Sequence, residues 1–197
     1  MVDSTMAELD SAVVLVTGAM AAGKSTVAQA LAERLPRAAH VRGDVFRRMV
    51  VTGRVEMTPD AGQEALAQLR LRYRLSVGTA DAYAAEGYTA VVQDVVLGEE
   101  LERYVGLVRT RPLYVVVLAP DADALAAREE GRAKTGYGEG WTPALMDRGM
   151  RETTPRIGLW LDSSGLTPEG TVDEILARLD EARVSRARPS GALSSGA

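Results

Sequence analysis

The stretch that decides the fold is "VVLVTGAMAAGKSTVAQALAERL", residues 13–35. A short run of apolar residues leads into a loop of small residues, and a helix-like pattern begins at Lys24. A continuous apolar run of this kind is typical of a parallel strand that is covered on both faces. The segment therefore predicts a strand, a tight loop and a helix in direct succession.

The loop between this strand and this helix fits the pattern G-x-x-x-x-G-K-[ST] in the context that the pattern requires. Glycines let the backbone wrap around a phosphate group, and the N-terminus of the helix adds about half a positive charge. We expect Lys24 to reach the β- and γ-phosphates of ATP and the Ser25 hydroxyl to hold Mg²⁺. A chance match in a chain rich in alanine and glycine is the competing interpretation, and the position after the first strand argues against it. The residues expected to bind the nucleotide here are Gly18, Ala19, Met20, Ala21, Ala22, Gly23, Lys24, Ser25 and Thr26.

The composition excludes several classes of protein. The chain has 197 residues, 46% of them hydrophobic, which fits one domain. It has no cysteine and one histidine, His40, which argues against zinc sites and against Ser-His or Cys-His catalysis. A net charge of −4 provides no bulk attraction to nucleic acid, so we expect no nucleic-acid partner. The chain shows no membrane-length apolar run and no signal-peptide pattern, which predicts a cytoplasmic protein without a membrane partner.

Strand-like and helix-like segments alternate along the chain. The predicted strands are 12–17, 38–42, 88–96, 113–119 and 157–162. The predicted helices are 24–35, a short one opened by Asp44, a long one over 59–86, 99–109, 121–131, a short one from Pro143, and 168–183. This alternation predicts an α/β fold, a three-layer sandwich around a five-stranded parallel sheet. We interpret 1–11 as a flexible leader, 12–183 as the domain and 184–197 as a disordered tail.

Two acidic residues lie near the carboxyl ends of predicted strands, where ligands of parallel sheets bind. Asp44 is expected to accept the proton of an attacking hydroxyl, although an N-cap role alone would also explain it. Arg47, one helical turn later, is expected to bind the substrate. Asp94 is expected to help to bind Mg²⁺ or to face the substrate. The alternative is that Asp94 is only a turn residue at the end of the strand.

An arginine-bearing segment, about 128–156, has the composition of a lid. Arg128 and Arg132 lie four residues apart on one helix face, and a glycine-rich stretch follows. Arginines that close over transferring phosphates contribute about 10³ to 10⁵ in rate. An ordinary solvated charged face is the competing interpretation. On the long helix, Tyr73 is expected to contact the substrate. The arginines Arg70, Arg72 and Arg74 on the same helix face either the pocket of the phosphate acceptor or water.

Together with "RGDVFRR", "QDVVLG" and the ending "WLDSSGLTPEGTVDEILARL", this layout resembles the small P-loop kinases over residues 12–182. It is most similar to the chloramphenicol phosphotransferase-like enzymes, with adenylylsulfate kinase and gluconate kinase as more distant relatives. The resemblance implies the strand order 2-3-1-4-5, Asp44 as catalytic base, and Arg128 and Arg132 as lid arginines. It also implies an adenine pocket at residues 162–165, which adds Ser163, Ser164 and Gly165 to the nucleotide-binding residues. The long helix departs from the family, so the acceptor need not be chloramphenicol.

The expected function is therefore an ATP- and Mg²⁺-dependent kinase that moves the γ-phosphate to a hydroxyl of a small molecule, with antibiotics and other natural products among the candidates. A nucleotide-dependent binding or switch protein that transfers no phosphate is the first alternative. A polynucleotide 5′-kinase is the second, and the acidic balance of the chain argues against it. The sequence leaves open whether the protein forms a homodimer. The residues expected to be catalytic are Lys24, Asp44, Arg128 and Arg132, and Arg128 is also expected to bind the nucleotide. The residues expected to bind the substrate are Asp44, Arg47, Tyr73 and Asp94. The residues expected to bind the metal are Ser25 and Asp94.

Overall fold

The computed structural model describes residues 7–130 and 140–185. Within them, five parallel strands form one sheet with the order β2-β3-β1-β4-β5, which confirms the expected order. The strands are β1 (Val13–Gly18), β2 (Ala38–Arg42), β3 (Thr89–Gln93), β4 (Leu113–Leu118) and β5 (Leu159–Leu161). Val16 of β1 lies opposite Gln93 of β3, and Gly18 lies opposite Leu118 of β4. Because the strands are parallel, their carboxyl ends meet at one edge of the sheet.

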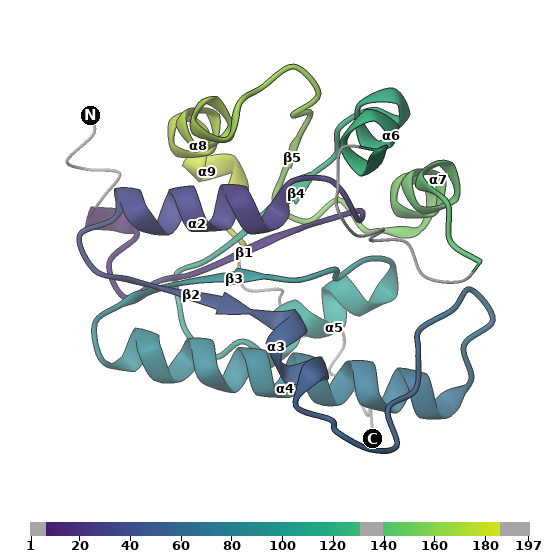
Figure 1. Ribbon diagram of the computed structural model, residues 1–197. Coiled ribbons are helices and arrows are strands. Elements are labelled where there is room, and N and C mark those ends of the chain that lie inside the picture. The colour runs from purple at the N-terminus through teal and green to yellow at the C-terminus, as the bar shows by residue number, and fades with distance from the viewer. Residues whose placement is uncertain (1–6, 131–139, 186–197) are drawn as a thin grey trace, which may run out of the picture.

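Helices cover both faces of this sheet and complete the predicted sandwich (Figure 1). One face carries α2 (Lys24–Arg34), α8 (Pro168–Ala177) and α9 (Leu179–Ala182). The other face carries α3 (Gly43–Arg48), α4 (Gln63–Ala85) and α5 (Glu99–Leu107). The remaining pair, α6 (Ala122–Glu130) and α7 (Pro143–Thr153), pack against each other beside the carboxyl ends of β4 and β5. No helix in the described ranges is long and apolar enough to cross a membrane.

The core follows the central strands. Every residue of β1 and β4 is buried, which explains their continuous apolar runs between two helical layers. Leu9 joins this core, and its carbonyl accepts a hydrogen bond from Thr89 Oγ1 at 2.6 Å. Leu9, which belongs to the expected leader, is thus packed on the sheet, whereas residues 7, 8 and 10 are exposed. The other parts of the expected leader, lid and tail, residues 1–6, 131–139 and 186–197, lie outside the described residues.

Most element boundaries differ from the sequence prediction by a few residues, and three of the differences have a local cause that the structure shows. The long helix α4 begins at Gln63 and not at Pro59, because residues 58–61 form a turn and extended Gly62 is its N-cap. The strand β3 ends at Gln93, since Thr17 Oγ1 donates to Val96 O and accepts from Val96 N, each at 2.9 Å, outside the strand ladder. The closing helix is divided at Arg178, whose φ of −117° and ψ of 29° are not helical.

A buried carboxylate ties α4 to the segment before β4. Asp81 Oδ1 accepts hydrogen bonds from Thr110 N at 3.0 Å and from Thr110 Oγ1 at 2.7 Å, and Oδ2 accepts from Arg109 N at 3.3 Å. Burial opposes the charge of Asp81, but these bonds outweigh burial and hold the pKa of its carboxyl below the usual value. The network therefore stabilises the fold while Asp81 is ionised.

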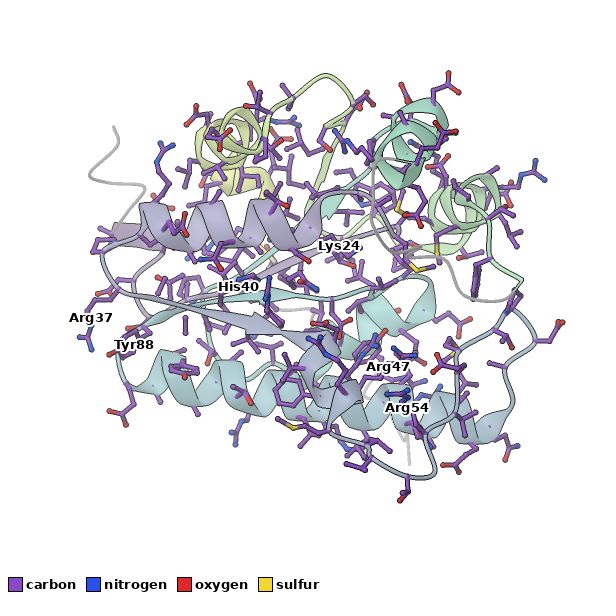
Figure 2. All side chains as sticks on the ribbon, viewed as in Figure 1. Lys24, Arg37, His40, Arg47, Arg54 and Tyr88 are labelled. Atoms are coloured by element: carbon purple, nitrogen blue, oxygen red, sulfur yellow. The ribbon has the colours of Figure 1, made fainter. Side chains whose placement is uncertain are left out.

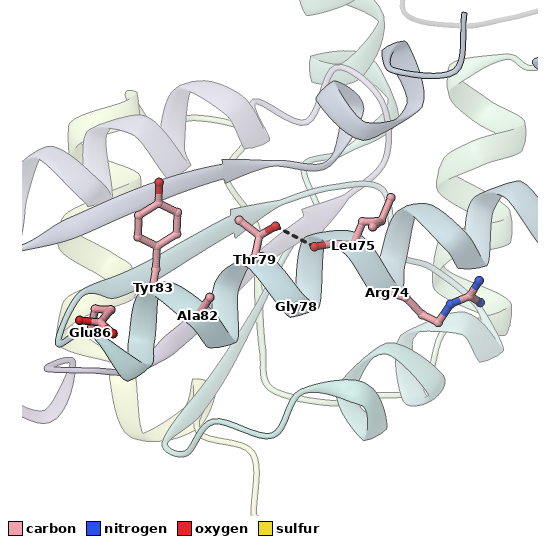
Figure 3. Close-up of a pocket in the computed structure, with 7 residues that line it drawn as sticks. All are labelled: Arg74, Leu75, Gly78, Thr79, Ala82, Tyr83 and Glu86. Carbon is pink, nitrogen blue, oxygen red and sulfur yellow. Dashed lines mark hydrogen bonds between the residues drawn. The ribbon is translucent and has the colours of Figure 1, made fainter. Parts of the chain in front are cut away.

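The outer face of α4 carries a hollow of about 550 Å³. Figure 3 shows the residues around it, which all come from this one helix or its end: Arg74, Leu75, Gly78, Thr79, Ala82, Tyr83 and Glu86. Thr79 Oγ1 donates to the Leu75 carbonyl at 2.8 Å within the helix. This hollow includes no residue of the phosphate loop, so it is separate from the candidate site described next.

Candidate active site

A cavity of about 590 Å³ opens at the carboxyl edge of the sheet. It lies beside β1, where the chain first turns to β2 and β3 on one side and later to β4 on the other. Such a reversal of strand order leaves a crevice that binds ligands in α/β folds. The predicted site residues that line this cavity are Met20, Ala21, Ala22, Gly23, Lys24, Ser25, Thr26, Asp44, Asp94, Arg128 and Ser163. Most of the predicted nucleotide and catalytic residues therefore share one space.

The phosphate loop has the backbone that its glycines predict. Gly18 has a φ of 143°, and a Cβ at this position would lie 2.3 Å from the Leu118 carbonyl oxygen. Gly23 has a φ of 89° and immediately precedes α2, whose first turn receives no side-chain cap. Gly23 has no side chain that could cap the amide groups at the start of α2, so this end of the helix is the kind of N-terminus that binds anions.

Lys24 is the first residue of α2 and is buried in the loop. Its Nζ donates to the Ala19 carbonyl at 2.6 Å, so the side chain folds back over the loop that it follows. Figure 2 shows Lys24 at the loop end of α2. The ammonium group and the helix N-terminus thus lie together, and this combination fits the phosphates of a nucleotide.

The Ser25 hydroxyl donates to Gln93 Oε1 at 2.7 Å. The hydroxyl and the amide are oxygen donors, the kind that Mg²⁺ prefers, so the residues fit this ion. Among the described residues there is no group of three or more His, Cys, Asp or Glu side chains that could hold a metal. A magnesium ion at Ser25 would consequently depend on the phosphates of the nucleotide for most of its ligands. Gln93 was not predicted as a site residue, although its place at the end of β3 was a usable signal.

Asp44 lies on the first turn of α3, and its carboxylate is half exposed at the cavity. The N-cap of α3 is Arg42, and α3 has no side-chain cap. The alternative explanation of Asp44 as an N-cap is therefore wrong. The carboxylate pairs with Arg48 Nη2 at 2.8 Å, on the same face of the helix.

Asp94 is buried at the inner end of the cavity. Its Oδ1 accepts from Val95 N at 2.7 Å and pairs with Arg72 Nη2 at 2.8 Å. Burial raises the pKa of the Asp94 carboxyl, and the nearby Arg72 guanidinium opposes that rise. The side chain also packs against Gly43, where a Cβ would lie 2.0 Å from Asp94 Oδ2. The substrate and metal roles expected for Asp94 stay predictions.

The arginines of α4 face three directions. Arg72 lines the cavity and is a site residue that the sequence did not single out from its neighbours. Arg70 pairs with Glu100 at 2.7 Å, and Arg74 lies at the hollow on the outer face (Figure 3). Only the packing of α4 on the sheet decides which of the three enters the site.

Two residues expected to contact substrate lie elsewhere. Tyr73 is 2% exposed, and its hydroxyl donates to the Val95 carbonyl at 2.7 Å, so it supports the site from within the core. Burial raises its pKa. Arg47 forms an ion pair with Glu56 in the loop after α3 and does not line the cavity. Figure 2 shows Arg47 and Arg54 near this loop. The prediction of direct contact fails for Tyr73 because its apolar ring and hydroxyl are both used in packing.

Arg128, on the last turn of α6, connects two walls of the cavity. Its Nη2 donates to the Ser163 carbonyl at 2.6 Å, and its Nη1 donates to the Ala22 carbonyl at 3.4 Å. Ser164 and Gly165 follow Ser163 but do not line the cavity, and the Ser164 hydroxyl bonds to Asp162 at 2.5 Å. The other predicted lid arginine, Arg132, lies outside the described residues.

Comparison with known families identifies the chain. A model of an AAA-domain family, AAA_33, matches residues 13–148, which include the phosphate loop, Asp44, Asp94 and Arg128. The chain belongs to this AAA-domain family. A search of curated proteins found no match.

Solved structures share the fold of this AAA-domain protein. An unliganded sugar kinase from Janibacter sp. HTCC2649 is 18% identical with a TM-score of 0.65, over 86% of this chain and 95% of the other. A tunicamycin resistance protein from Deinococcus radiodurans is 15% identical with a TM-score of 0.62, over 88% and 98%. The APS kinase of Mycobacterium tuberculosis, solved with AMPPNP and APS, is 18% identical with a TM-score of 0.58, over 85% and 96%. These likenesses confirm the P-loop kinase fold that the motifs predicted.

Proposed function

We propose that this protein is an ATP- and Mg²⁺-dependent phosphotransferase that moves the γ-phosphate of ATP to a hydroxyl group of a small molecule in the cytoplasm. One observation carries the proposal: the phosphate loop and the Asp44 carboxylate, which caps no helix, line the same cavity. A nucleotide-binding switch would need the loop but would need no general base for an acceptor hydroxyl in the same cavity.

The chain's own residues can divide the chemistry among them. Lys24 and the first amides of α2 hold the β- and γ-phosphates. Asp44 accepts the proton of the acceptor hydroxyl as its oxygen attacks the γ-phosphorus, and the bond from that phosphorus to the oxygen of ADP breaks. Arg128 neutralises charge on the transferring group. Bound beside Ser25, Mg²⁺ supplies further neutralisation of phosphate charge.

The acceptor class that we propose is a polyhydroxylated small molecule, a class that includes sugars and natural-product antibiotics. Two structural neighbours, described as a sugar kinase and a tunicamycin resistance protein, support placing both groups in the first screen. The volume of the cavity, about 590 Å³, matches the 300–1,000 Å³ usual for small-molecule sites.

A screen for ADP release against hydroxylated compounds tests the proposal, with mass spectrometry to identify a product that carries one added phosphate. We expect Lys24→Ala to abolish turnover and Asp44→Asn to reduce it about 10²- to 10⁴-fold, since a general base contributes in that range. Asp60→Asn is the matched control, because it makes the same change in an exposed acid outside the cavity. If both site variants retain full turnover, or ATP binds and no phosphorylated product forms, the proposal is wrong.

A further inference from the structure

The last residue of β3 contacts the phosphate loop from the neighbouring strand. Gln93 lies opposite Val16 of β1 and is buried with 6% of its surface exposed. Its amide oxygen receives the hydrogen of the Ser25 hydroxyl at 2.7 Å, and both residues line the cavity. The two side chains come from positions 68 residues apart, so only the fold brings them together.

The direction of this hydrogen bond has a chemical consequence for Ser25. A hydroxyl group has one hydrogen and two lone pairs. It offers a lone pair to a cation while its hydrogen points away from that cation, and an acceptor on the far side favours this orientation. Because Gln93 Oε1 accepts that hydrogen, the lone pairs of Ser25 Oγ remain available for Mg²⁺.

The neighbouring acid, Asp94, makes its polar contacts through one carboxylate oxygen, Oδ1, whereas its Oδ2 is buried without a hydrogen-bond partner among the described residues. Asp94 directs Oδ1 to Val95 N and to Arg72, and its Oδ2 lies against the start of α3 at Gly43. No hydrogen bond joins Asp94 to Ser25 in the part of the chain that the structure describes. The contacts of Asp94 Oδ1 with Val95 and Arg72 thus leave Gln93 as the hydrogen-bond partner of the serine hydroxyl.

We infer that Gln93 orients the Ser25 hydroxyl toward Mg²⁺ and that this neutral pair takes the ion only together with the nucleotide phosphates. The inference rests on the proposed function, since it assumes a metal–nucleotide complex at the phosphate loop. Gln93 is a positioning residue that acts through Ser25. In this inference Gln93, and not Asp94 as the sequence suggested, is the residue at the end of β3 that supports Mg²⁺ binding at Ser25.

The charge of the pair explains the dependence on nucleotide. Ser25 and Gln93 carry no net charge, whereas Mg²⁺ is usually bound by one or two carboxylates together with phosphates. Because neither member of this pair is a carboxylate, we expect the phosphates of the nucleotide to supply the negative charge that holds the ion. The wild-type protein should therefore show no saturable binding of Mn²⁺, used as a paramagnetic probe, until ATP is added.

The experiment measures the affinity of the full-length protein for ATP by calorimetry, with EDTA and with Mg²⁺. The ratio of the two dissociation constants gives the gain due to the metal. We expect Gln93→Leu to reduce this gain about 10- to 100-fold, the usual effect of losing a partner of a metal ligand. Affinity in EDTA should stay within about threefold, because the phosphate loop itself is unchanged. Gln93→Glu keeps the acceptor and should keep the gain.

Two comparisons make the test specific. Asp94→Asn should leave the metal-dependent gain as in the wild type, whereas a metal role for Asp94 would remove it. In a Ser25→Ala background, Gln93→Leu should have no further effect on the gain, since the two residues act as one unit. An unchanged gain in Gln93→Leu, or saturable Mn²⁺ binding without ATP, overturns the inference. Failure to bind ATP in EDTA would instead refute the proposed function.

Discussion

The contact between Gly43 and Asp94 allows a quantitative prediction for Gly43→Ala. Gly43 is the first residue of α3, next to Asp44, and a Cβ there would lie 2.0 Å from Asp94 Oδ2 and 2.3 Å from Cγ. Real contacts of this kind do not fall below 3.0 Å, so α3 or Asp94 must move by about 1 Å. Forcing an added methyl group into a packed site costs about 1–3 kcal/mol. The cost rises to about 3–5 kcal/mol if the buried pair of Asp94 and Arg72 separates.

Urea unfolding provides the assay, and the expected loss for Gly43→Ala is about 1–3 kcal/mol in the free energy of unfolding. Gly78→Ala is the matched control, since its Cβ on the exposed face of α4 would meet nothing within 4 Å. This control should gain about 0.5–1 kcal/mol, because alanine stabilises a helix relative to glycine. A displacement of Asp44 by about 1 Å should also reduce turnover about 10²-fold. If Gly43→Ala is as stable as the wild type while Gly78→Ala behaves as expected, the packing described at the start of α3 is wrong.

Three further predictions address other parts of the molecule. Gly18→Ala should destabilise the protein by more than about 3 kcal/mol in urea unfolding, because its Cβ would meet the Leu118 backbone oxygen, which cannot move aside as a side chain can. Asp81→Asn should lower the free energy of unfolding by about 1–3 kcal/mol at pH 7, because it weakens the hydrogen bonds that the Asp81 carboxylate accepts from Thr110 and its neighbour. Burial alone would raise the pKa of Asp81, but these hydrogen bonds outweigh burial and lower it. The pKa of Asp81 is lower in the folded protein than in the unfolded chain, so the wild type is more stable than the Asn variant above the unfolded pKa of about 4. This difference in the free energy of unfolding should disappear as the pH falls from the unfolded pKa through the folded one. Arg128→Ala should lower kcat about 10³-fold or more in the ADP-release assay, and an effect on stability alone would contradict its proposed role.

Much of the fold follows from local sequence. The apolar runs of β1 and β4 are buried throughout, and the glycines of the phosphate loop have the positive φ values that their positions require. These features depend on residues close together in the chain, whose periodicity and conformational freedom can be read directly. The same holds for Lys24, whose partner is the carbonyl of Ala19, five residues away.

The predictions that failed depend on how helices rotate against the sheet. Tyr73 and Arg72 are adjacent on α4, yet the tyrosine points into the core and the arginine lines the cavity. A helix turns by about 100° per residue, so a small rotation of the whole helix decides which neighbour enters the site. The short helix α3 shows the same dependence, since Asp44 lies at the cavity while Arg47 pairs with Glu56 outside it.

The amino-acid sequence by itself determined the alternation of strands and helices, the phosphate loop and the position of Asp44 after the second strand, because each depends on chemistry within a few residues. The tertiary structure alone decided that Gln93 meets Ser25 and that Asp94 meets Arg72. Each of these pairs joins residues from different elements, which the chain brings within hydrogen-bonding distance only after the strands align and the helices pack on them.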